Sequence, residues 1–140
     1  MQTLLNHLAS RLGQQPFVSD RQGHYHLHID NYNLFLRQQG TELVLSSPLS
    51  WRHNPKDTSG AELLKRLLQQ VTRWGRKAPH ALTLDESENL ILEARLNLDS
   101  LDVQILEQML TLHIELLEQI MTLLSETQSA PQWKQAIWQP

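Results

Sequence analysis

Three histidines alternate along a short segment of the chain, at His24, His26 and His28. Alternate residues of a β-strand lie on one face about 6–7 Å apart, so a neighbouring pair could chelate a metal ion. The first and third side chains would be twice as far apart, and no carboxylate at a diagnostic spacing completes a set of three or four ligands. The pattern therefore indicates a polar strand face, and we expect no bound metal.

The other residues that could do chemistry lack visible partners. His113 lies within the apolar arc of a predicted helix, which is typical of a core or interface histidine that is hydrogen-bonded to a neighbour. No nucleophile-elbow sequence supports a Ser/His/Asp triad, and the five glycines are too scattered to cradle a phosphate. There is no cysteine, which excludes thiol catalysis, disulfides and Cys-ligated zinc. We therefore predict no catalytic residue, no cofactor and no enzymatic activity.

The charge balance excludes further partner classes. The net charge is −3 and the pI is about 6.1, so the chain has no broad electrostatic attraction for nucleic acid or anionic lipid. No segment is long enough and free enough of charge to cross a bilayer, and Met1–Gly13 lacks the features of a signal peptide. We expect a soluble, cytoplasmic protein that binds no nucleic acid and does not insert into a membrane.

Hydrophobic periodicity divides the chain into eight elements. Helical spacing predicts helices near 1–13, 59–74 and 100–126, with Asp99 or Ser100 capping the last. A period of two predicts strands near 24–29, 32–37, 42–47, 81–84 and 90–98. Pro48 is expected to end the third strand. The predicted fold class is α+β, in the order α-β-β-β-α-β-β-α, with an antiparallel twisted sheet packed against helices.

The apolar surface exceeds what one small sheet can cover. The last helix has an apolar arc of about 200°, which is wider than a single sheet contact needs. The second helix carries a further stripe of leucines, and Phe35 and Val44 fall on strand faces opposite the predicted core. We therefore predict a two-fold homodimer with apolar surface left for a partner protein.

The order of elements, the 16.2 kDa size and the leucine-rich final helix after Leu90-Ile-Leu-Glu-Ala-Arg-Leu-Asn-Leu-Asp resemble the class I type III secretion chaperones, the family of the Tir chaperone. The resemblance covers residues 1–127 as a secretion-chaperone-like domain and leaves 128–140, with Trp133 and Trp138, as a C-terminal tail. It implies a non-enzymatic homodimer in the bacterial cytoplasm. Such a dimer binds the N-terminal segment of one or more secreted effectors, keeps it secretion-competent and delivers it to the export ATPase of the secretion system.

The resemblance also implies two sets of contact residues. The dimer interface is expected on the second helix and the strand beside it, at Leu64, Leu68, Val71, Trp74 and Leu82. Cargo is expected on apolar patches of the sheet and first helix, at Leu12, Phe17, Phe35 and Val44. Two other hypotheses stay open: a different non-enzymatic α+β adaptor or regulator, and a metal-dependent enzyme built on the face of His24, His26 and His28.

Overall fold

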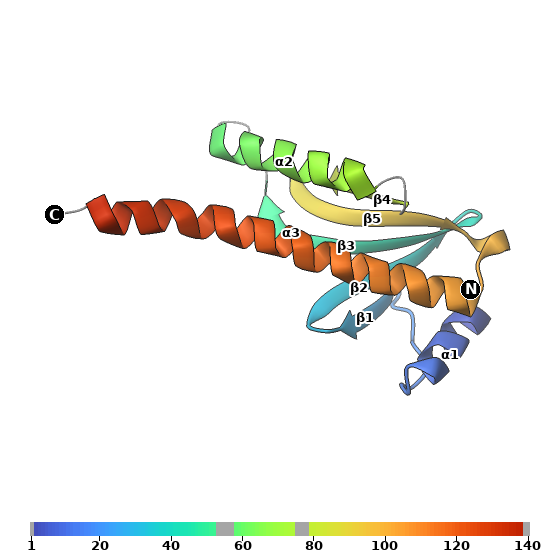
Figure 1. The fold of residues 1–140 in the computed structure, drawn as a ribbon. Coiled ribbons are helices and arrows are strands. Elements are labelled where there is room, and N and C mark those ends of the chain that lie inside the picture. Colours follow the sequence, from blue (N-terminus) through green and yellow to red (C-terminus); the bar gives the residue numbers. More distant parts are fainter. Residues whose placement is uncertain (1, 53–57, 75–78, 139–140) are drawn as a thin grey trace.

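The computed structural model describes residues 2–52, 58–74 and 79–138, without the side chains of Arg52, Trp74 and residues 126–138 (Figure 1). Its elements are α1 (Gln2–Arg11), β1 (Tyr25–Ile29), β2 (Tyr32–Gln39), β3 (Glu42–Arg52), α2 (Thr58–Trp74), β4 (His80–Leu84), β5 (Asn89–Asn97) and α3 (Val103–Trp138). A short 3-10 turn, Leu98–Ser100, precedes α3. The predicted α+β class and order of elements are confirmed.

The five strands form one antiparallel sheet in the order β1-β2-β3-β5-β4. Asp30 and Asn31 join β1 to β2 with φ angles of 51° and 68°, a pair of left-handed residues that suits the twist of a two-residue hairpin. Gly40, with a φ of 61°, serves the turn between β2 and β3. The sheet therefore ends in two edge strands, β1 and β4.

All three helices pack on the same face of the sheet, as Figure 1 shows with α3 crossing in front of the strands. Leucines of α1 and of the first half of α3 form one core cluster with Leu27 and Leu36 of the sheet. Leucines of α2 and of the second half of α3 form a second cluster with Leu90 and Leu92. The wide apolar arc of α3 is thus explained, because it contacts the sheet, α1 and α2 in turn.

β3 does not end at Pro48, as expected, but continues to Arg52. The prediction was wrong because β2 pairs with β3 only as far as Ser46, so β5 is the one neighbouring strand at Pro48. A proline is tolerated where a strand needs hydrogen bonds on one side only. The register then shifts between Pro48 and Arg52, with a φ of 54° at Ser50, which marks a bulge.

The last helix begins and ends later than expected. The Asp99 N–H donates to Asn97 Oδ1 at 3.0 Å and holds the 3-10 turn, so the cap falls instead to Asp102, whose Oδ1 accepts the Ile105 N–H at 2.7 Å. α3 then continues past Glu126 to Trp138, and its C-terminal part extends beyond the sheet in Figure 1. Within the described part of the chain, no helix is both long and apolar enough for a membrane span.

Candidate protein-binding surfaces

The face of the sheet opposite the helices, here called the open face, is the first candidate surface. Side chains alternate along a strand, so Phe35, Val44 and Ile91 point away from the leucines that pack under the helices. None of these three belongs to either core cluster. Across the described residues, no helix packs on this face, so it is available to a partner.

The two predicted cargo residues on the open face differ in exposure. Phe35 is half-buried and stacks on the ring of His26, with 4.7 Å between centroids and 8° between planes. Val44 is 0% exposed, because its neighbours across the strands on both sides are Arg37 and Arg95. Phe35 can therefore contact a partner directly, whereas Val44 lies beneath the arginines.

A small polar network fixes those arginines. Arg37 Nη1 and Arg95 Nη1 both donate to Gln39 Oε1, at 3.2 Å and 3.3 Å, and Arg95 Nε forms an ion pair with Glu93 at 2.9 Å. Their aliphatic stems can cover an apolar residue while the charged heads stay in water. The sequence pattern placed Val44 on the right face but gave no sign of this cover, which depends on the strand register.

The alternating histidines also lie on the open face. His26 Nε2 and His28 Nδ1 are 2.9 Å and 3.1 Å from Asn33 Oδ1, so both rings donate to one amide oxygen. The backbone N–H of His24 donates to Asp20 Oδ1 and is the main cause that lowers the pKa of that carboxyl. Among the residues that the structure describes, no three His, Asp or Glu side chains are arranged to hold a metal.

The end of α1 carries a second candidate surface. Leu12 is 36% exposed and Val18 is 83% exposed, whereas Phe17 is partly buried against the first core cluster. An ion pair of 2.7 Å between Arg11 Nε and Glu107 Oε2 joins α1 to α3. Of the predicted cargo residues here, Leu12 is accessible and Phe17 mainly supports the core.

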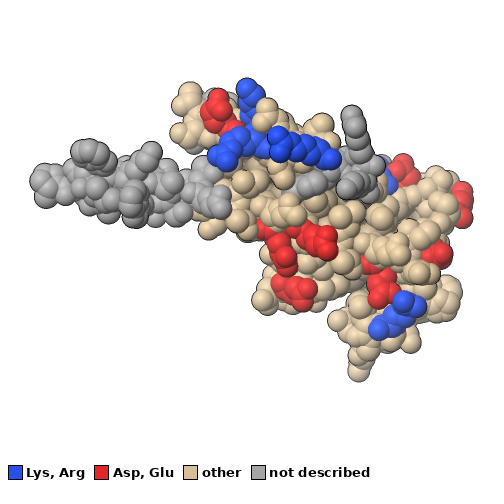
Figure 2. All heavy atoms as spheres, in the orientation of Figure 1, with Lys and Arg blue, Asp and Glu red and all other residues tan. Residues whose placement is uncertain are grey.

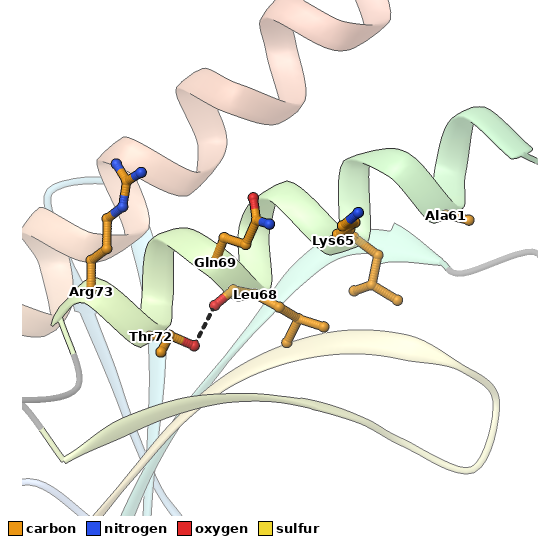
Figure 3. Close-up of a pocket in the computed structure, with 7 residues that line it drawn as sticks. Ala61, Lys65, Leu68, Gln69, Thr72 and Arg73 are labelled. Carbon is orange, nitrogen blue, oxygen red and sulfur yellow. Dashed lines mark hydrogen bonds between the residues drawn. The ribbon is translucent and has the colours of Figure 1, made fainter.

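The outer side of α2 is the third candidate surface. On the side of α2 that faces the core, three residues are buried: Leu63, Leu67 and Val71. Leu68, the residue that follows Leu67, points away from the core and is 44% exposed. A shallow, largely apolar groove runs along this side, as Figure 3 shows, and is lined by Ala61, Leu64, Lys65, Leu68, Gln69, Thr72 and Arg73. In Figure 2, Lys and Arg side chains gather over α2 whereas acidic side chains lie along α3.

The five predicted interface residues are not equally placed. Leu68 is exposed, while Leu64 and Leu82 are partly buried against the second core cluster. Val71 is 6% exposed and belongs to that cluster, so a partner could reach only its edge. The side chain of Trp74 lies outside the described residues, as do those of Trp133 and Trp138 in the predicted tail.

Comparison with known proteins decides between the open hypotheses. The chain matches the Tir chaperone protein (CesT) family over residues 3–121. It belongs to this family. The family is one of non-enzymatic type III secretion chaperones, so the predicted function class is confirmed.

Individual relatives of this chain agree with the family match. It is 40% identical over 111 residues to the chaperone protein YscB of Yersinia enterocolitica and of Yersinia pestis, covering 79% of this chain and 81% of theirs. The HopA1–SchA chaperone–effector complex matches with 25% identity and a TM-score of 0.66, covering 86% of this chain and 91% of that one. The ExoU–SpcU complex of Pseudomonas aeruginosa matches in fold, with 18% identity and a TM-score of 0.67, over 88% and 96% of the two chains.

Proposed function

We propose that this chaperone binds the N-terminal segment of one or more secreted effectors, keeps that segment secretion-competent and delivers it to the export ATPase from the cytoplasm. The family match over residues 3–121 carries the proposal. A protein held for export must not fold locally, so its bound segment is extended and presents backbone hydrogen-bonding groups and alternate side chains. The chaperone needs no catalytic group for this work.

Cargo is assigned to the open face and to the end of α1. Phe35 and its stacked partner His26 offer an aromatic platform on β2 and β1, and Leu12 adds an exposed apolar contact. β1 is an edge strand that pairs with β2 on one side, and its other side is bridged at Tyr25 by Ser19, so the rest of that side can accept a strand from cargo. Within the predicted set, Phe35 and Leu12 make direct contacts, whereas Val44 lies beneath Arg37 and Arg95 and Phe17 packs on the first core cluster.

A two-fold homodimer is assigned to the outer side of α2 with the edge strand β4. The exposed Leu68 and the partly buried Leu64 form an apolar strip with Ala61, and Leu84 at the end of β4 is also 43% exposed. Cations such as Lys65 and Arg73 flank the strip, which fits an apolar interface centre with a polar rim. A second copy would bury leucines that water otherwise contacts.

Co-purification tests the function directly. The full chain, tagged and expressed in its native host, should retain effectors that mass spectrometry identifies, and their N-terminal segments should bind in isolation and be protease-resistant when bound. Deleting the chaperone should abolish export of those effectors. Retention of mature, fully folded effector domains without their N-terminal segments would contradict the proposal.

A further inference from the structure

A chain of buried hydrogen bonds crosses the sheet–helix interface. Ser47 Oγ of β3 is 2.8 Å from His113 Nε2 of α3, and His113 Nδ1 is 3.0 Å from His80 Nε2 at the start of β4. Ser47 is 1%, His113 0% and His80 6% exposed. The three residues thus connect an inner strand, the long helix and an edge strand through a single polar path.

The path ends on an unsatisfied atom. His80 Nδ1 is buried and has no hydrogen-bond partner in the described part of the chain. If His113 Nδ1–H donated to His80, the proton of His80 would lie on Nδ1 as a buried N–H without an acceptor, which is costly. The better arrangement has His80 Nε2–H donating to His113 Nδ1 and His113 Nε2–H donating to Ser47 Oγ. His80 Nδ1 then carries a bare lone pair, which is the atom that a further proton would occupy.

Among the described residues, which exclude 75–78 just before His80, no neighbouring charge is positioned to stabilise that proton. The residue opposite His80 on β5 is Ala94, while Glu93 and Arg95 project to the open face and pair with each other. Glu115 on α3 and Arg73 on α2 are both exposed. On β3, the residue that the path reaches is Ser47, which carries no charge. Burial accordingly lowers the pKa of His80 to about 4, and burial followed by repulsion from His80 lowers that of His113 to about 3.

We propose that Ser47, His113 and His80 form an acid-sensitive latch that holds β4 to the core when neutral and releases it when His80 gains a second proton. β4 is the element that gives way because it is five residues long, lies at the sheet edge and pairs with β5 alone. His80 is its first residue, so a short movement there brings the imidazolium into water. Release alters the edge beside α2 without unfolding the inner strands.

Hydrogen exchange in the full-length protein tests the latch. After correction for intrinsic exchange rates, the protection of the amides of residues 80–84 should fall about tenfold for each pH unit below 6.5, the ordinary value for histidine. Amides of β2 and β3 are exposed by global unfolding, so they should stay more strongly protected than those of β4 at every pH in this range. His80→Gln retains an amide that can bond to His113 but does not titrate, so its β4 protection should lose this pH dependence. His28→Gln, on the open face, should behave as the wild type.

A second measurement needs no variant. In the ¹⁵N spectrum of the wild type, His80 and His113 should both remain neutral at about pH 5 with the proton on Nε2, and of the two it is His80 whose Nδ1 should lack a hydrogen bond. Three results would overturn the latch: protonated imidazoles at both His80 and His113 in the folded protein at that pH, equal protection of β2 and β4 at each pH, or unchanged pH dependence in a folded His80→Gln protein.

Discussion

Val44 is covered by side chains of its own sheet rather than by a helix. The arginines on either side of it share Gln39 as an acceptor, and their stems exclude water from a residue that the sequence pattern assigns to the surface. An aspartate introduced at this position would lie between two guanidinium groups, so it would not report cleanly on cargo binding. Removing volume is the more informative change.

Val44→Ala should lower the free energy of unfolding by about 2 kcal/mol, because it leaves a cavity beneath the arginines. Affinity for a cargo segment should stay within about twofold of the wild type, since Val44 does not reach the surface. Urea unfolding followed by calorimetry on the same samples gives both values. A large loss of affinity with unchanged stability would mean that cargo displaces the arginines and contacts Val44.

The buried histidines make stability depend on pH. Their native pKa values of about 4 and about 3 lie below the ordinary 6.5, so between these values the unfolded chain binds more protons than the native one. Above pH 6.5 these two histidines therefore leave the free energy of unfolding unchanged. Below pH 6.5 each of them lowers it by about 1.4 kcal/mol per pH unit. Urea unfolding between about pH 7 and pH 5 should show this slope. His113→Gln should reduce it by about half, and an unchanged slope in that variant would assign the effect to other groups.

At the scale of elements, α2 is apolar on two sides, of which the core covers one. Leu68→Asp should prevent dimerisation, because a charge in an apolar interface has no partner there, and the monomer should stay folded since the residue is 44% exposed. Ile105→Asp is the matched control, at 38% exposure on α3. Light scattering should give about twice 16.2 kDa for the wild type and the control, and 16.2 kDa for Leu68→Asp. A wild-type protein that is monomeric, or that forms a complex with a different protein in place of its second copy, would contradict the homodimer.

The elements themselves could be predicted because periodicity reports which side of a helix or strand is buried. Phe35 and Val44 were assigned to the face opposite the core from alternation alone, and neither belongs to a core cluster. The errors arose where the outcome depends on pairing: Pro48 ends a strand only when both sides need hydrogen bonds, and here one neighbour is absent. The partners of His113 were missed for the same reason, since Ser47 and His80 lie 66 and 33 residues away in the sequence.

At the scale of the whole molecule, cargo binding should show the thermodynamics of ordering an extended segment. Calorimetry against an effector's N-terminal segment should give a negative heat-capacity change and an unfavourable entropy. Phe35→Asp should weaken binding by tenfold or more, roughly the effect of 1.4 kcal/mol, while leaving the dimer intact. Met121→Asp, on α3, is the control and should bind as the wild type. If Phe35→Asp and Met121→Asp bind the segment with equal affinity, the cargo site does not lie on the open face.

The position of the edge strands sets the reach of a cargo segment. Adjacent strands are spaced by about 4.8 Å, so the five-stranded sheet is roughly 20 Å wide from β1 to β4. In a dimer joined through α2 and β4, the two β1 edges lie at opposite ends, roughly 50 Å apart once about 10 Å between facing elements is added. An extended chain advances about 3.3 Å per residue, so a segment shorter than about 15 residues cannot bridge them. Peptides below that length should bind two per dimer, and longer ones should be able to bind one per dimer, a change of stoichiometry that a length series measured by calorimetry would reveal.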